Sequence, residues 1–377
     1  MTEDQLQNWK LLKRFKGFLA DRADRFPKAP TELDGRRTLF RDDYFCLHLF
    51  GLLNPVLKTM RGLCRATHLP KMRQVCPETV SLGSFSAAQH QFDPAILEDI
   101  VRDLASRARP SFGDPRLREI SKTLSAVDGS VLRALHRMTW APAAGHGCAV
   151  RVHLHFEVFT QTPEDWTITP ASHCERKVWA ARVRPGRFYI CDRLYSNQHQ
   201  LLARVRAAGA DFVMRLKGNI ILDPVGEARE LSEADRQAGV VWDRSMSLGC
   251  KEGGPVFRVV RIEAEGKEFL LVTTREDLPA ELIGLIYRYR WQIEVFFKWI
   301  KSLWKSAHWI AESPRGVAIQ IYTLFIGALL LAQWTGRPPG KRQLEALQLF
   351  AMGFTDEAGL ELLLELEEKS KKAAKKA

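Results

Sequence analysis

The stretch YRYRWQIEVFFKWIKSLW (287–304) contains the pattern from which the rest of the chain can be interpreted. It has good helix formers and no Gly or Pro, so it predicts one helix over Tyr287–Lys301. Successive helical residues are rotated by about 100°, which divides this helix into two faces. One face is apolar and should pack on a core. That face carries Ile293, Phe296, Ile300 and Leu303.

The opposite face gathers one carboxylate, three cations and a phenol. These are Glu294, Arg290, Lys298, Lys301 and Tyr287. Such a set suits a metal-bound phosphate, because the acid can hold the cation while the other side chains hold phosphate oxygens. The alternative is a solvated face in which Glu294 forms an ion pair with Lys298 or Arg290. Taken alone, the helix favours this alternative.

The spacing Tyr287-x2-Arg290-x3-Glu294-x6-Lys301, with Trp291 after the arginine, resembles the YREK signature of DDE transposases of the insertion-sequence-four family. Four residue types at fixed spacings are far more specific than a single short motif. The resemblance implies two further aspartates upstream, each at the end of a strand.

Two aspartates fit that expectation. Asp128 lies where an apolar run reaches Gly129, and Asp192 directly follows the apolar run RFYIC (187–191). As structural alternatives, Asp128 would be a turn residue before the glycine and Asp192 a partner of Arg193. By the resemblance, Asp128, Asp192 and Glu294 are the catalytic residues and the metal ligands.

The predicted elements around these aspartates follow the order of a ribonuclease H-like sheet: three strands, helix, strand, helix, strand. After the first strand they are strands over 147–159 and 165–170, a helix over 172–183, the strand before Asp192, a helix over 196–209 and a strand over 210–217. In this topology the first and fourth strands are adjacent. The carboxylates of Asp128 and Asp192 should therefore emerge side by side, with Glu294 arriving from a helix over the sheet.

Three converging carboxylates repel one another unless divalent cations lie between them. The family resemblance implies two Mg²⁺ ions, which Mn²⁺ can replace. Such a pair can activate a water or a 3′-hydroxyl and stabilise the leaving oxygen of a phosphodiester.

The resemblance also implies a set of DNA-binding residues. Those expected to hold phosphates of the DNA ends are Tyr287, Arg290, Lys298 and Lys301, joined by Arg193 and Arg215. Arg193 belongs to DRLY (192–195), which is similar to the family's D-R-G-Y; Leu194 stands where Gly is usual, so the turn should differ slightly. Arg215 matches a basic position after the fifth strand, with a solvated strand end as its alternative. Trp242 and Trp291 are candidates to stack on a base, although a core position is favoured for each.

The fold class expected is mixed α/β, a ribonuclease H-like catalytic core with a mostly β insertion and an N-terminal helical domain. Residues 1–115 would bind DNA ends or cap the core, and both interpretations stay open. Residues 120–335 would form the core, with the insertion at 218–275, and residues 336–377 a C-terminal helical region with a basic tail. Within 1–115 we expect helices over 4–24, 45–65 and 94–107 and a loop over 81–92; within the insertion, 240–249 and 255–274 should be antiparallel strands that turn at 265–266.

Composition supports a folded protein with a polyanionic partner. Hydrophobic residues make up 46% and charged residues 27%, and the formal net charge is +12. The seven cysteines are scattered without a C-x2-C pair, which suits a reducing cytoplasm. Val317–Trp334 is apolar but interrupted by Gln320, Thr323 and Gln333, so we expect a buried helix behind the sheet and no membrane span.

The resemblance implies a bacterial, nucleoid-associated transposase that binds double-stranded DNA at inverted-repeat ends, cuts it and joins it to target DNA. A homodimer holding two ends is expected, with 341–367 as the candidate partner surface or, equally, as helices packed on the core. The alternatives are a ribonuclease H-like nuclease without strand transfer and a domesticated, inactive DNA-binding protein.

Overall fold

The computed structural model describes residues 9–28, 32, 37–110, 114–117, 120, 122–143, 145, 147–196, 199–249, 254–264, 266–306 and 309–374. The chain forms two compact units, which we name the sheet unit and the helical unit. The sheet unit comprises Arg109–Leu132 and Val150–Val295. The helical unit comprises Met1–Ala108, Arg133–Ala149 and Phe296–Ala377.

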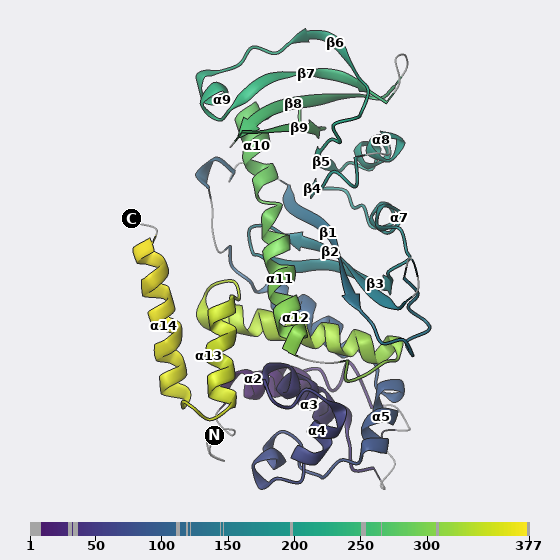
Figure 1. The fold of residues 1–377 in the computed structure, drawn as a ribbon, viewed down its shortest axis with the longest axis vertical. Helices are drawn as coiled ribbons and strands as arrows, with labels where there is room; N and C mark the ends of the chain where they lie inside the picture. Colours follow the sequence, from purple (N-terminus) through teal and green to yellow (C-terminus); the bar gives the residue numbers. More distant parts are fainter. Residues whose placement is uncertain are drawn as a thin grey trace. The chain divides into compact units, whose positions relative to one another are not determined.

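One mixed sheet of nine strands organises the sheet unit, in the order β3-β2-β1-β4-β5-β9-β8-β7-β6 (Figure 1). The strands are β1 Thr123–Arg133, β2 Ala149–Glu157, β3 Thr162–Pro170, β4 Arg187–Cys191, β5 Asp211–Arg215, β6 Leu222–Ala228, β7 Val240–Leu248, β8 Val256–Ala264 and β9 Lys267–Thr273. β1 pairs in parallel with β4, β4 pairs in parallel with β5, and β2 pairs antiparallel with β3. The predicted strand order and the mixed α/β class are confirmed, and both are consistent with a ribonuclease H-like core.

Two short helices connect the strands around β4, as predicted. They are α7 Glu175–Ala180 and α8 His199–Ala207, each shorter than expected. Leu202 of α8 packs with Phe212 and Met214 of β5 in a buried cluster that also contains Trp179 and Tyr195. This cluster fixes β4 and β5, and so the chain on either side of Asp192.

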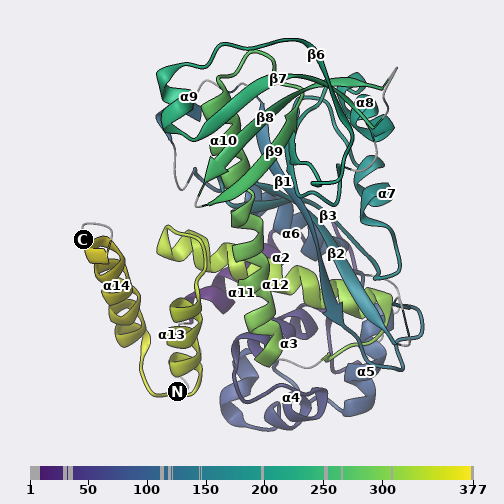
Figure 2. The same ribbon diagram turned by 45° about the horizontal axis from the view of Figure 1, so that its top comes forward.

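The segment predicted to be a β insertion, 218–275, which we call the insertion, extends the same sheet, because β9 pairs antiparallel with β5. Figure 2 shows β6 to β9 side by side. The predicted strands 240–249 and 255–274 correspond to β7, β8 and β9; residue 265 of the expected turn lies outside the described residues. Strand β6 and helix α9 Glu233–Gln237 were not predicted. Pro224 and Gly226 in β6 hide its strand character in the sequence.

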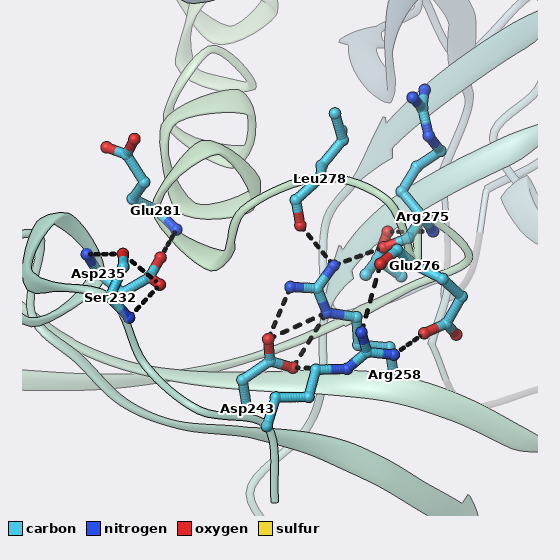
Figure 3. A network of polar contacts seen from close by, with 10 residues as sticks. Ser232, Asp235, Asp243, Arg258, Arg275, Glu276, Leu278 and Glu281 are labelled. Carbon is cyan, nitrogen blue, oxygen red and sulfur yellow. Dashed lines mark hydrogen bonds and ion pairs between the residues drawn. The ribbon is translucent and has the colours of Figure 1, made fainter.

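A buried polar network joins the insertion to the segment before helix α10 Ala280–Arg288 (Figure 3). Arg258 of β8 forms a bidentate ion pair with Asp243 of β7, with N–O distances of 3.0 and 2.6 Å. Arg258 Nη1 also donates to the backbone carbonyls of Arg275 and Leu278, at 2.8 and 2.6 Å. At the start of α10, the Glu281 backbone N–H donates to Asp235 Oδ1 at 2.8 Å. These bonds fix where α10 begins.

The prediction of one helix over 287–301 is wrong. The chain forms α10, which ends at Arg288, and α11 Trp291–Ser306. At the junction the backbone N–H groups of Tyr289, Arg290 and Gln292 donate to carbonyls three residues earlier, at 3.0–3.1 Å. This tighter pattern interrupts the α-helix without any Gly or Pro. The expected apolar face is confirmed, since Ile293, Phe296, Ile300 and Leu303 are all buried.

The helical unit contains helices from both ends of the chain. They are α2 Lys10–Ala20, α3 Arg41–Leu53, α4 Met60–Ala66, η2 Pro70–Gln74, α5 Leu82–Gln91, α6 Ala95–Ser106, α12 Pro314–Thr335, α13 Lys341–Ala351 and α14 Glu357–Ala374, with part of α11. A further short 3-10 helix, η3 Pro115–Leu117, belongs to the sheet unit. In the helical unit, α12 packs against α2, α3, α5 and α6.

Two of the N-terminal predictions are corrected. The loop expected over 81–92 is helix α5, because Ser81 Oγ accepts the backbone N–H of Ser84 at 3.0 Å and caps it. The single helix expected over 45–65 is two, α3 and α4. Asn54 ends the first, and its Oδ1 accepts the N–H groups of Val56 and Leu57. The helix over 94–107 is confirmed as α6. Within 4–24, α2 confirms a helix over Lys10–Ala20, whereas residues 21–24 form a turn.

Helix α12 is a core helix, as predicted for 317–334. It is long and apolar enough to cross a membrane, but 78% of its most apolar window is buried in the protein. Two of its buried polar residues bond to backbone groups. Gln320 Oε1 accepts from the Ile310 N–H at 2.9 Å, and Thr323 Oγ1 donates to the Ile319 carbonyl at 2.7 Å.

The region 341–367 is helical, as expected, and some of its leucine side chains are buried while others are exposed. Leu344, Leu347, Leu360 and Leu364 are buried, whereas Leu349 is exposed. Helix α14 continues to Ala374, so most of the expected basic tail is helical, and residues 375–377 lie outside the described residues.

Candidate active site

The β1–β4 ladder sets the position of the two aspartates. Its last pair in register is Val127 with Cys191. Asp128 and Asp192 are therefore the first residues beyond it on two adjacent parallel strands, which lie about 4.8 Å apart. The prediction that Asp128 ends the first strand is wrong in its bounds, because β1 continues to Arg133. The β1–β4 ladder stops just before Asp128 and Asp192, so these two residues lie side by side, as predicted.

Asp128 lies in a partly buried, acidic environment. Burial, reinforced by the carboxylates of Glu175 and Glu294, raises the pKa of its carboxyl to about 6. The backbone N–H of Gly129, which donates to Asp128 Oδ1 at 2.8 Å, and the Arg290 guanidinium act in the opposite direction. The carboxyl group is thus surrounded by negative charge that a cation would neutralise.

Glu294 lies in the first turn of α11, where Arg290 Nη1 donates to its Oε1 at 2.5 Å. This ion pair spans the junction between α10 and α11. The Arg290 guanidinium also lies 5.8 Å from the centroid of the Tyr287 ring. The structural alternative named for this helix, a pair between Glu294 and Arg290, is therefore present.

Tyr287 and Arg290 connect this helix to the strand ends. Burial raises the pKa of Tyr287; Asp192 raises it as well, whereas Arg290 and Arg215 lower it. Asp192 in turn stabilises the charged form of Arg290 and so raises its pKa. The charges of six groups therefore influence one another at this site. They are Asp128, Asp192, Glu294, Tyr287, Arg290 and Arg215.

The other predicted DNA-binding residues differ in exposure. Arg193, Lys298 and Lys301 are exposed. Trp291 is 52% exposed, so the core position favoured for it is wrong, whereas Trp242 is half-buried against the core of the sheet unit. The guanidinium of Arg215 lies 4.6 Å from the Phe269 ring centroid, which anchors it at the end of β5.

The turn after Asp192 accommodates Leu194 without positive φ. Among the described residues other than glycine, only Gln161 has a positive φ. The Tyr195 N–H donates to the Asp192 carbonyl at 3.1 Å and closes the turn. Leu194 is 41% exposed, so its side chain points largely to solvent.

The three acids have the right chemistry for a divalent cation, since Mg²⁺ and Mn²⁺ prefer carboxylate oxygens. Across the described residues, however, no three His, Cys, Asp or Glu side chains are already grouped closely enough to hold one. Glu294 is instead ion-paired with Arg290.

Glu175, in the first turn of α7, is a residue that sequence reasoning missed. Its carboxylate lies against the backbone at Gly129, next to Asp128. The signal available was topological: an acid that begins the helix between the third and fourth strands.

Comparison with known proteins gives a consistent result. A family model described as "Transposase DDE domain" matches residues 119–331. The protein named "Probable transposase for insertion sequence element IS5377", from Geobacillus stearothermophilus, is 27% identical over 223 residues, 56% of this chain and 56% of that protein. A Sinorhizobium fredii protein named as transposase y4zB is 27% identical over 220 residues, 57% of this chain and 61% of that protein. A Synechocystis protein named as a transposase for insertion sequence element IS4SA is 22% identical over 279 residues, 67% of this chain and 72% of that protein.

Proposed function

Because the chain belongs to the DDE transposase domain family, we propose that it is the transposase of an insertion sequence, cutting DNA at terminal inverted repeats and joining the 3′ ends to target DNA. The observation that carries this proposal is the end of the β1–β4 ladder, which brings Asp128 and Asp192 together beside Arg290 and Glu294. The alignments span 56% and 61% of the first two relatives, so the activity of the whole protein is part of the proposal.

Members of the DDE family generally use divalent metal ions. We assign the ligands here to Asp128, Asp192 and Glu294, and the natural ion to Mg²⁺, with Mn²⁺ as a substitute. Two such ions would supply activation of the attacking water or 3′-hydroxyl and stabilisation of the leaving oxygen.

The side chains around the acids would orient the DNA backbone. Arg290 is the main candidate, because its planar guanidinium can hold two phosphate oxygens once Glu294 turns to the metal. Tyr287 would donate its hydroxyl to a neighbouring phosphate. Lys298 and Lys301 follow Glu294 by four and seven residues on α11, and therefore lie on the same side of that helix. Tyr287, Arg290, Glu294 and Lys301 have the spacing of the YREK signature, which supports placing the chain in the insertion-sequence-four group.

We propose further DNA contacts at Arg193, Arg215 and Trp291. Arg193 and Arg215 would hold phosphates, and Trp291, which is 52% exposed, could stack on an unpaired base. We assign residues 1–115 to end recognition or capping, 120–335 to the catalytic core, 218–275 to the insertion and 336–377 to the C-terminal region. A DNA substrate of this kind places the protein in the bacterial cytoplasm, at the nucleoid.

The active species would be a homodimer that bridges two ends. One set of three acids makes one site, whereas excision must cut at two distant ends, and a dimer couples the two cuts. Light scattering with and without terminal-repeat DNA tests this. A complex of one protein and one end that cuts at the full rate would contradict it.

The direct test of function is a joining assay. Terminal-repeat DNA, identified by searching the genomic flanks for inverted repeats, is incubated with a target plasmid and Mg²⁺. We expect joined products from the wild type and none from Asp192→Ala. Cut ends without joined products would indicate a nuclease instead. Binding without cutting would indicate an inactive DNA-binding protein.

A further inference from the structure

A fourth carboxylate lies beside the three acids. Glu175 at the start of α7 is only 12% exposed, and both of its oxygens have partners. Arg151 of β2 forms an ion pair with Oε1 at 2.8 Å. The Tyr195 hydroxyl donates to Oε2 at 3.3 Å. Arg151 neutralises Glu175 and both of its oxygens have partners, which suits a structural role near the acids.

One end of this arrangement reaches Asp128. A Cβ atom added at Gly129 would lie 2.7 Å from Glu175 Oε2 and 2.9 Å from Cδ. The carboxylate therefore rests on the Gly129 backbone, whose N–H holds Asp128 Oδ1 at 2.8 Å. The glycine has no positive φ, so only this contact excludes a side chain there.

The other end reaches Asp192. Tyr195 is 2% exposed, and its ring packs edge-on against Trp179 of α7, with centroids 5.5 Å apart. Its backbone N–H closes the turn on the Asp192 carbonyl at 3.1 Å. The hydroxyl of the same residue binds Glu175. A single carboxylate thus contacts the segments that carry both aspartates.

We propose that Glu175 is a positioning residue that fixes the spacing of Asp128 and Asp192. Its carboxylate contacts the Gly129 backbone on one side and the Tyr195 hydroxyl on the other, and Arg151 holds this carboxylate in place. We call this set of contacts the brace. The inference rests on the proposed function, because it assumes that the two aspartates bind a divalent cation. Removing a residue that orients metal ligands typically lowers metal affinity by about 10–100-fold.

The test measures Mn²⁺ binding to the DNA-free protein by calorimetry, together with single-turnover cleavage of terminal-repeat DNA. Glu175→Gln and Gly129→Ala should each weaken Mn²⁺ binding by about tenfold. The melting temperature should stay within a few degrees of the wild type. Asp128→Ala provides the reference for a lost ligand.

A double-mutant cycle separates bracing from general damage. Glu175→Asp shortens the acid by one methylene and makes room for a Cβ at position 129. Gly129→Ala combined with Glu175→Asp should therefore bind Mn²⁺ more tightly than Gly129→Ala alone. If each substitution acted independently, the double variant would instead bind Mn²⁺ more weakly than either single variant, by the product of their two fold-losses in affinity. This cycle remains informative even if Glu175→Gln fails to fold.

Glu164→Gln is the matched control. Glu164 is also an ion-paired acid of the sheet unit, bound to Arg187 and 15% exposed, but its partner on β1 is Ser125. It should leave Mn²⁺ binding unchanged. If Glu175→Gln binds Mn²⁺ with wild-type affinity, the brace is overturned. The same holds if the double variant binds Mn²⁺ no more tightly than Gly129→Ala alone. Wild-type binding by Asp128→Ala would overturn the proposed metal site and the brace with it.

Discussion

Asp128 combines a partly buried carboxyl group with two acidic neighbours, which makes it unfavourable for folding in the absence of a cation. An unfolded Asp has a pKa of about 3.9. In the folded protein burial, reinforced by Glu175 and Glu294, raises that pKa to about 6. Between these values the folded state keeps a proton that the unfolded state has released. The contribution of Asp128 to the free energy of unfolding therefore falls as the pH rises from the unfolded to the folded pKa. Above the folded pKa, the charged carboxylate destabilises the folded state by its full amount.

Asp128→Asn should consequently stabilise the metal-free protein at pH 7.5, by about 1–3 kcal/mol. The gain should shrink as the pH is lowered through 6 and disappear below about 4, where the wild-type acid is protonated in both states. Urea unfolding in EDTA across this range measures the effect. Asp277→Asn is a control of opposite sign, because a hydrogen bond from Arg275 lowers the pKa of Asp277 to about 2. An asparagine variant at 128 that is no more stable at pH 7.5 would contradict this account.

The sequence singled out the three predicted acids but not their surroundings. Glu294 was singled out by the resemblance to the YREK signature, and Asp128 and Asp192 by their places after apolar runs, where that resemblance implies acids. Glu175 lies within no comparable pattern. Its contact with Gly129 depends on how α7 is oriented by Trp179, which is a tertiary effect.

At the scale of elements, helix α10 depends on a buried ion pair in the insertion. Arg258 and Asp243 are 2% and 3% exposed, and Arg258 also holds the carbonyls of Arg275 and Leu278 before α10 (Figure 3). Because α10 continues through Tyr287 to the junction with α11, the pair helps to set where Arg290 and Glu294 lie. Its removal should therefore affect both stability and cleavage.

Arg258→Met leaves Asp243 buried without its main partner and should cost about 3–5 kcal/mol of unfolding free energy. Replacing both residues, as Asp243→Leu with Arg258→Met, should recover much of this loss. The matched control is Arg261→Met on the same strand, whose pair with Glu268 is 38% and 49% exposed. The control should change stability by less than about 1 kcal/mol. Equal losses for Arg258→Met and Arg261→Met in urea unfolding would refute the role of the buried pair.

The elements also show where pattern reasoning fails. Alternation located β7 to β9, but β6 contains Pro224 and Gly226 and gave no strand signal. The junction at Tyr289 and Arg290 contains strong helix formers, so no local feature predicts the break between α10 and α11. Its position is consistent with the fixed start of α10, which is a tertiary constraint.

At the scale of the whole molecule, the order of strands and helices predicted the ribonuclease H-like core, since that order permits few topologies. The sequence did not reveal that the insertion continues the core sheet through the β5–β9 pairing, because strand pairing between distant segments leaves no local pattern. The helical unit likewise combines N-terminal helices with 296–377, a grouping that only long-range packing determines.

The central claim is that Asp128, Asp192 and Glu294 act as one metal-dependent cutting site. Single-turnover cleavage of terminal-repeat DNA by the three alanine variants and their triple combination tests it most directly, with end binding measured in parallel. We expect each single variant to lose cleavage while retaining end binding, and the triple variant to be scarcely worse than the singles, because residues that act as a unit are not additive. An alanine variant at any one of the three that cuts at close to the wild-type rate would contradict the claim.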